Sequence, residues 1–243
     1  MLKFKDLHIG FKGKSKQEDT LLFKTAHQSF EAGDFVALIG ANGAGKTTLF
    51  NTVLGLHKAL KGNVLIEGQP LKEISREEKV KYLSYVPSKF SGIEHLTTYD
   101  LIALGRSPYT NILNRLTEND HQRIKEVIQQ LDLTSLKDKD TLSLSDGERQ
   151  IAMIGKALAQ DSKLMVLDEP TAFLDYNNKR KIMYLLHDLA KKNKQLIFIS
   201  SHDIELCFDY CNRIIAIDSH AKELIHFNTP FDKNEVIKSV FGG

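Results

Sequence analysis

Several features are scarce in this 243-residue chain, and each scarcity narrows what the protein can be. There is no tryptophan, and there are only two cysteines and five prolines. The formal net charge is only +2, because 33 basic residues nearly balance 31 acidic ones. Charge alone therefore gives little reason to expect nucleic acid as a partner, although it does not exclude one. With 42% hydrophobic residues, the chain is long enough to bury a sizeable core, so we expect a globular protein.

Long apolar runs are also missing. The apolar stretch 196–199 is too short to span a bilayer, and residues 1–6 alternate apolar and charged types instead of forming the core of a signal peptide. Cys207 and Cys211 lie one helical turn apart, with no further cysteine or evident histidine to complete a metal site. We therefore expect a soluble chain whose two thiols are packed and reduced.

A glycine-rich segment directly follows the apolar run 35–39 and precedes a helix-like stretch at 48–54. It matches the pattern G-x-x-x-x-G-K-[ST]. Its candidate ligand-binding residues are Gly40, Ala41, Asn42, Gly43, Ala44, Gly45, Lys46, Thr47 and Thr48. Glycines let backbone N–H groups converge on phosphate oxygens, and the helix start adds positive partial charge. The alternative is a glycine-rich turn without a ligand.

Two side chains in this segment indicate which ligand it would bind. Lys46 is expected to reach the β and γ phosphates as a point charge, and the Thr47 hydroxyl is placed to ligate Mg²⁺. The segment therefore predicts a nucleoside triphosphate, ATP, with Mg²⁺. Phe11 precedes a polar loop at 12–19, and its ring either stacks on the adenine base or is an ordinary residue at a sheet edge.

The remaining chain alternates strand-like and helix-like segments, which predicts a sheet with crossover helices. Strands are expected at 2–8, 21–30, 62–67, 83–86, 164–167, 196–200, 213–217 and 223–227, and helices at 76–82, 98–104, from 118, 176–192 and 234–240. Residues 98–160 are mostly helical. Within them, Thr117 to Asp120 predict a capping box, and the apolar residues Ile124, Val127, Ile128 and Leu131 recur after it at helical spacing. The fold predicted is α/β, a single domain over 1–243 with an inserted helical subdomain at about 98–160.

Two carboxylates end the apolar strand predicted at 164–167. Ligands bind at the carboxyl ends of strands in open α/β sheets, so Asp168 and Glu169 are candidate catalytic residues. Asp168 is suited to hold Mg²⁺ in the outer shell, and Glu169 to orient or deprotonate the water that attacks the γ phosphate. The alternative is a polar strand end before a turn.

Residues 144–148, Leu-Ser-Asp-Gly-Glu, allow two interpretations that do not exclude each other. Ser145 with Glu148 three residues later predicts a capping box for a helix that reaches residue 159. A serine, Gly147 and a helix N-terminus also form a second phosphate-binding surface. One phosphate loop in one chain does not need two such surfaces, so something else must supply the opposing phosphate.

This combination of motifs resembles the ATP-binding cassette (ABC) family across nearly the whole chain. The segment 40–47 resembles its Walker A loop, 145–148 its signature motif, 164–168 its Walker B strand, and Glu169 its catalytic carboxylate. Residues 173–175, ending in Asp175, resemble the D-loop, and His202 resembles the switch histidine that contacts the γ phosphate. The resemblance implies a P-loop NTPase fold with an N-terminal antiparallel β subdomain and an inserted helical subdomain.

The resemblance also implies partners. Family members work as pairs with ATP held between the Walker A loop of one copy and the signature of the other, so the expected partners are a second copy and a membrane permease. Residues 101–109 resemble ATPases that serve importers of iron-siderophores, haem or cobalamin, which implies an extracytoplasmic substrate-binding protein and a cytoplasmic location on the inner face of the cell membrane. The alternatives are the ATPase of an exporter or lipoprotein-release system, or a soluble ABC ATPase outside transport.

Two residues depart from the family pattern. Ser88 follows Pro87 where the family usually has the Q-loop glutamine, so its shorter hydroxyl is expected beside Mg²⁺ but acting through water. Asp146 replaces a usual glycine. A helix N-terminus favours this carboxylate but a triphosphate repels it, so its side chain is expected to point away from the nucleotide.

Overall fold

The computed structural model describes residues 1–13, 18–110 and 115–241. It divides into two compact units, the first made of Met1–Ser75 with Met183–Gly243 and the second of Arg76–Ile182. Part of the loop predicted at 12–19 lies outside the residues that the structure describes.

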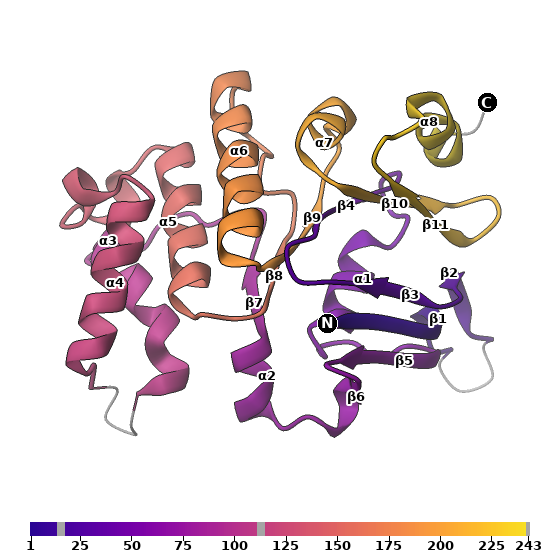
Figure 1. Ribbon diagram of the computed structural model, residues 1–243, viewed down its shortest axis with the longest axis horizontal. Helices are drawn as coiled ribbons and strands as arrows, with labels where there is room; N and C mark the ends of the chain where they lie inside the picture. Colours follow the sequence, from indigo (N-terminus) through magenta and orange to yellow (C-terminus); the bar gives the residue numbers. More distant parts are fainter. Residues whose placement is uncertain (14–17, 111–114, 242–243) are drawn as a thin grey trace. The chain divides into compact units, whose positions relative to one another are not determined.

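Half of the first unit is an antiparallel sheet built around its first strand (Figure 1). Its strands are β1 (Leu2–Phe11), β2 (Thr20–Thr25), β3 (Gln28–Phe30), β5 (Lys61–Ile66) and β6 (Gln69–Pro70). The single strand predicted over 21–30 is wrong, because β2 pairs with Leu7 to Phe11 and β3 with Leu2 to Phe4. The ladder breaks between them at Asp6, whose φ of 46 is left-handed and whose N–H donates to the Ala26 carbonyl at 3.3 Å.

The strands in the rest of this unit form two parallel pairs and one antiparallel pair. β4 (Phe35–Ile39) lies between β9 (Leu196–Ser200) and β10 (Arg213–Asp218), and β11 (Glu223–Asn228) is antiparallel to β10. The helices are α1 (Lys46–Val53), α7 (Ile204–Tyr210) and α8 (Lys233–Phe241), with a 3₁₀ turn at Leu71–Glu73. All residues of β4 and β9 are buried, as in a parallel sheet covered on both faces. The helix α7 was not predicted from the sequence.

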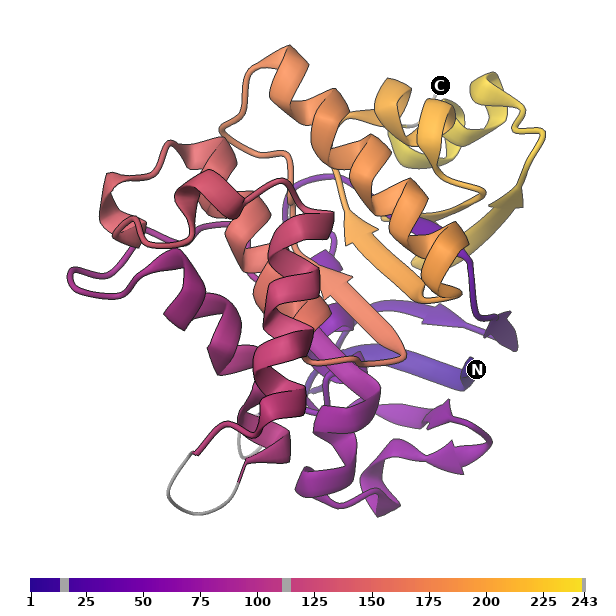
Figure 2. The same cartoon turned by 60° about the vertical axis from the view of Figure 1, so that its left-hand side comes forward.

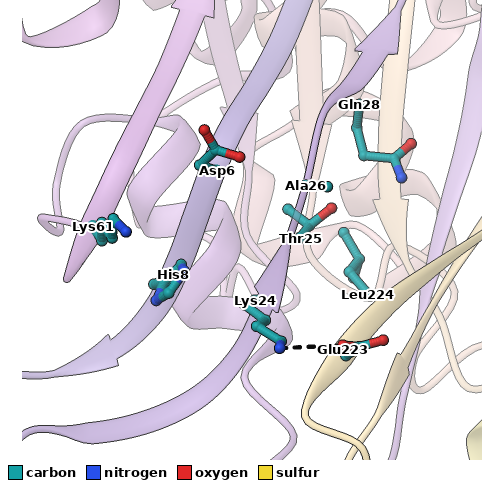
Figure 3. A pocket seen from close by; sticks show the side chains of 9 residues that line it. All are labelled: Asp6, His8, Lys24, Thr25, Ala26, Gln28, Lys61, Glu223 and Leu224. Carbon is teal, nitrogen blue, oxygen red and sulfur yellow. Dashed lines mark ion pairs between the residues drawn. The ribbon is translucent and has the colours of Figure 1, made fainter.

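A polar hollow of about 410 Å³ lies where these two parts of the sheet join (Figure 3). Lys61, His8, Lys24 and Glu223 are directly opposite one another on β5, β1, β2 and β11. The Lys24 ammonium lies 3.3 Å from the Glu223 carboxylate, and both side chains are about half exposed. β2 and β11 are joined through a single pair of facing residues, and the ion pair adds a second contact between these strands. Solvent screening keeps the contribution of this ion pair to stability small.

The second unit contains three helices that pack against one another, α3, α4 and α5 (Figure 1 and Figure 2). Its elements are α2 (Arg76–Tyr82), β7 (Leu83–Val86), α3 (Thr98–Ala103), α4 (Glu118–Gln130), α5 (Asp146–Ala159), β8 (Leu164–Leu167) and 3₁₀ turns at Leu104–Tyr109, Thr134–Leu136 and Thr141–Ser143. β7 and β8 are parallel. The helix α6 (Tyr176–Asn193) begins in this unit and continues in the first.

Capping boxes begin all three packed helices. Thr97, Thr117 and Ser145 each accept a hydrogen bond from the N–H three residues on, and the acidic residue there accepts one in return. The predicted caps at Thr117 and Ser145 are thus confirmed. The apolar stripe predicted for α4 is buried at Ile124, Val127 and Ile128.

Both cysteines are buried and neither forms a disulfide, as expected. They lie in and just after α7, and burial raises the pKa of the Cys211 thiol, with a further contribution from Cys207. A high pKa leaves little thiolate, so Cys211 is a poor nucleophile. Across the described residues, none of the helices combines the length and apolar character needed to cross a bilayer.

Candidate nucleotide-binding site

The glycine-rich segment forms the connection between β4 and α1, as its position in the sequence predicts. Gly43 and Gly45 have φ of 77 and 108, in the left-handed region that disfavours side chains. A Cβ at Gly45 would also lie 2.9 Å from Leu22 Cδ1 and 3.0 Å from Phe23 Cε1. At Gly43 only the backbone conformation requires glycine, whereas at Gly45 packing against β2 requires it too.

Lys46 is the first residue of α1, and its side chain folds back over the loop. Its ammonium donates to the Gly40 carbonyl at 2.9 Å and approaches the Ala41 carbonyl at 3.4 Å. Only 7% of the residue is exposed. A buried ammonium beside a turn of backbone amides gives this loop the positive potential that a phosphate chain needs.

His202 lies against Lys46, which is 156 positions away in the chain. It follows β9, and its Nε2 is 3.3 Å from the Lys46 ammonium. Since an ammonium only donates, the Nε2 of His202 is the acceptor in this pair. The structure therefore brings together two of the residues for which sequence analysis predicted contacts to the γ phosphate.

Phe11 ends β1 with 49% of its surface exposed. Its ring meets the ring of His57 edge to face, with centroids 5.5 Å apart. The His57 Nε2 lies 2.8 Å from the Gly10 carbonyl, an acceptor, so this nitrogen carries the proton. His57 thus fixes the environment of Phe11, a role that no local sequence pattern indicates. Stacking on adenine stays a prediction.

In the second unit, Asp168 and Glu169 follow β8 directly. The Asp168 N–H donates to the Val86 carbonyl at 2.9 Å, so it extends the β7–β8 ladder, and only 9% of the residue is exposed. Glu169 has a left-handed φ of 48, and its carbonyl accepts from the Ala172 N–H at 3.0 Å. Strained backbone at a carboxylate that ends a strand is typical of functional positions.

The segment 145–148 forms the start of α5. The Glu148 carboxylate accepts from the Ser145 N–H and hydroxyl, both at 2.8 Å, and these bonds lower the pKa of Glu148. Asp146 lies 3.4 Å from the Arg149 guanidinium. A Cβ on Gly147 would lie 3.3 Å from Asn178 Cγ, so α6 packs closely here. The capping interpretation is confirmed, while the second phosphate-binding surface stays a prediction.

Comparison with known proteins places these features in a family. The family model described as ABC transporter matches residues 23–172, from β2 through the phosphate loop and past Glu169. This chain belongs to the ABC transporter family. Its members are ATPases, and the P-loop ABC fold predicted from the sequence is confirmed.

Individual relatives extend the match over the whole chain. An uncharacterized ABC transporter ATP-binding protein of Methanocaldococcus jannaschii is 32% identical over 99% of this chain and 81% of its own. A probable siderophore transport system ATP-binding protein of Bacillus subtilis is 33% identical over 82% of this chain and 72% of its own. Among solved structures, a chain of an inward-facing ABC transporter of metal-chelate type superposes on this chain with a TM-score of 0.84. It is 26% identical in sequence, and the match covers 99% of this chain and 88% of that chain.

Asp175, which sequence resemblance predicts to lie in the D-loop, caps α6. Its carboxylate accepts from the Asn178 N–H at 3.0 Å and from the Asn178 side-chain amide at 2.6 Å, and these bonds lower its pKa. Phe173, two residues earlier, is 77% exposed with a φ of 66. The cap explains the local structure of Asp175, and its contact with nucleotide stays a prediction.

Ser88 lies just after β7 and lines a hollow together with Asp146, Arg149 and Gln150 of α5. The two departures from the family pattern therefore share one surface. Sequence analysis singled out neither Arg149 nor Gln150, because a helix start predicts a cap but not which later side chains turn inward.

Ser88→Ala is expected to lower the ATPase rate far less than Lys46→Ala does. Ser88→Ala removes a short hydroxyl that acts through water, whereas Lys46→Ala removes a buried charge aimed at the phosphates. Steady-state phosphate release at saturating MgATP measures both rates, and the melting temperatures of both variants serve as folding controls. Equal, near-complete losses would show that Ser88 participates directly.

Proposed function

We propose that this chain is the ATP-hydrolysing subunit of an ABC importer, which pairs with a second copy around ATP and drives a separate membrane permease. The observation that carries the proposal is the buried Lys46 ammonium, held over the phosphate loop with His202 at 3.3 Å. The named relatives support import, because they include a siderophore transport protein and a metal-chelate transporter. The cargo class is then an iron-siderophore, haem or cobalamin.

Each candidate site residue has a distinct role in ATP hydrolysis under this proposal. The Thr47 hydroxyl would be a direct ligand of Mg²⁺, the Asp168 carboxylate would hold the ion in the outer shell, and the Ser88 hydroxyl would act on it through water. Bound Mg²⁺ would neutralise phosphate charge. Glu169 accepts a proton from the attacking water and aligns it with the γ phosphate. Lys46 and His202 contact the γ phosphate, and Ser145 with Gly147 bind the phosphates held by the other copy.

The proposed location, at the inner face of the cell membrane, follows from the permease. Exposed apolar side chains on the second unit offer a surface for it, since Ile93 and Leu142 are each 54% exposed and Leu104 is 48% exposed. The Ile93 N–H donates to the Thr141 hydroxyl at 2.9 Å, so Ile93 and Leu142 lie on adjoining segments. Tyr109 is another exposed apolar side chain of this unit. It is less suited to permease binding, because its hydroxyl is already held by a hydrogen bond to the Gln160 carbonyl.

Ile93→Glu and Leu142→Glu are expected to release the permease while the purified chain keeps its basal ATPase rate. Each change puts a charge at an apolar contact, where buried anchors carry much of the affinity. Co-purification from membranes that contain the cognate permease measures binding, and phosphate release measures activity.

The matched control is Ile237→Glu, which charges an apolar residue on α8 that is 40% exposed. It should leave permease binding unchanged. If both charged variants bind the permease like the wild type, the docking surface lies elsewhere. If the wild type itself hydrolyses ATP but binds no membrane protein, the chain is an ABC ATPase outside transport.

A further inference from the structure

A short segment after α1 returns the chain to the end of β1. Gly55 reverses the chain at the C-terminus of the helix with a left-handed φ of 75, and the His57 N–H donates back to the Asn51 carbonyl at 3.0 Å. Three residues later, the Leu60 N–H donates to the His8 carbonyl at 2.9 Å. His57 is therefore fixed between α1, which begins at the phosphate loop, and β1, which ends in the ring predicted to stack on adenine.

Two contacts join the His57 side chain to the last residues of β1. Its Nε2 donates to the Gly10 carbonyl at 2.8 Å. Its imidazole meets the Phe11 ring with the centroids 5.5 Å apart and the ring planes at 64°. A Cβ on Gly10 would overlap the Thr20 carbonyl oxygen, so β2 encloses the backbone tightly at this point. The histidine thus bonds to a rigid strand end and restrains the ring that follows it.

The Phe11 ring is held by a neighbour and is still open to a ligand. About half of the residue, 49%, is exposed, and His57 supplies the only ring contact to it within the described residues. An exposed ring at a strand end would otherwise exchange between rotamers, and a ligand that stacks on it would have to order it at a cost in entropy. A ring that is already restrained avoids most of this cost.

We propose that His57 is a positioning residue for the nucleobase, because it holds the Phe11 ring in place to receive the adenine of ATP. This role rests on the proposed binding of ATP and on the predicted stacking of Phe11. His57 acts through Phe11 and the Gly10 carbonyl, without touching the nucleotide itself. Since the phosphate loop and His57 lie at opposite ends of α1, this one helix sets the spacing between the phosphate contacts and the base contact.

The test compares ADP with inorganic pyrophosphate, which has phosphates but no base, by titration calorimetry on the full chain with Mg²⁺ present. We expect His57→Ala to weaken ADP binding about three- to tenfold, the range for the loss of one aromatic contact. Pyrophosphate binding should stay within about twofold of the wild type, because the phosphate loop is unchanged. His57→Phe keeps a ring and His57→Gln keeps a donor, so each should recover part of the ADP affinity.

A double-mutant cycle with Phe11→Ala separates positioning from direct contact with the base. Phe11→Ala removes the ring itself, so it should weaken ADP binding at least as much as His57→Ala does. In the Phe11→Ala background, His57→Ala should have no further effect on ADP. His220→Ala is the matched control, because His220 is an exposed histidine in the turn between β10 and β11, and it should change the affinity for neither ligand.

A loss of ADP affinity that needs Phe11 and spares pyrophosphate supports the proposal. Equal losses for both ligands would assign His57 a structural role only, and losses that add in the double variant would mean that His57 contacts the base directly; either result overturns the positioning role. Unchanged ADP affinity in Phe11→Ala overturns it as well. If His57→Ala does not fold, His57→Gln enters the same cycle.

The proposed function fails in a different way, because a wild-type chain that binds neither ligand would overturn it together with the role of His57. No membrane protein is present in these titrations. Their outcome for His57 is therefore the same whether or not the chain drives an importer.

Discussion

Glu169→Gln is expected to lower ATP turnover by about 10²- to 10⁴-fold while ATP still binds. The amide keeps the size of the side chain but loses the basic oxygen that accepts a proton from water. The left-handed backbone at Glu169, with a φ of 48, fixes where this side chain begins, and glutamine tolerates the same conformation about as well. The loss should therefore fall on kcat and not on ATP affinity.

Phosphate release at saturating MgATP measures this loss, and equilibrium binding of ATP checks that affinity is kept. Because ATP is held between the two copies in the proposed pair and the variant does not hydrolyse it, the ATP-bound variant should accumulate as a dimer in size-exclusion chromatography. Glu67→Gln is a matched control, since Glu67 also has a left-handed φ, 50, and lies in the turn after β5. Near-normal phosphate release by Glu169→Gln would assign the proton acceptor to another residue.

Those features that depend on a few neighbouring residues were predictable from the sequence. The capping boxes at Thr117 and Ser145 depend on side chains three positions apart, and the strands at 83–86, 164–167 and 196–200 have the bounds predicted. The phosphate loop belongs to this class as well, because its chemistry lies in eight consecutive residues whose flanking strand and helix are equally local.

Features set by distant parts of the chain were not predictable. The break between β2 and β3 depends on the backbone at Asp6, which lies on another strand. His57 meets Phe11 from 46 positions away, and no pattern near either residue indicates the contact. Similarly, Ser88 and Gln150 are recognisable as lining one hollow only once β7 and α5 are placed together. Apolar periodicity reports which side chains face inward, but not which polar side chains meet there.

Arg106→Ala is expected to destabilise the protein by about 3–5 kcal/mol, the largest stability effect we predict. The Arg106 guanidinium donates to Asp120 at 2.9 Å, to the Ala159 carbonyl at 2.7 Å and to Asp161 at 2.6 Å. Arg106 and Asp120 are 9% and 3% exposed. Removing the arginine leaves the Asp120 charge buried without its cation, and loosens the contacts among the 3₁₀ turn after α3, α4 and the end of α5.

The pH dependence of stability distinguishes this network from simple loss of packing. Burial by itself raises the pKa of the Asp120 carboxyl, but hydrogen bonds from Thr117 and the charge of Arg106 outweigh it, so the net pKa lies below its ordinary value. A depressed pKa gives stability that is complete above the unfolded pKa of about 3.9 and is lost as pH falls through the folded pKa. Without Arg106 the folded pKa of Asp120 rises, so Arg106→Ala should lose less stability than the wild type as pH falls, and the difference between the two proteins should shrink toward pH 3.

Urea denaturation at neutral pH and along a pH series down to about 3 measures both effects. Arg106→Lys should recover only part of the loss, because an ammonium cannot reproduce the planar set of donors that reaches Asp120, Ala159 and Asp161 together. Lys24→Ala is the control, since its ion pair with Glu223 is about half exposed and should contribute at most about 1 kcal/mol. If Arg106→Ala costs no more than Lys24→Ala at neutral pH, and its cost does not shrink as pH falls, the buried charges are not what holds the three helices together.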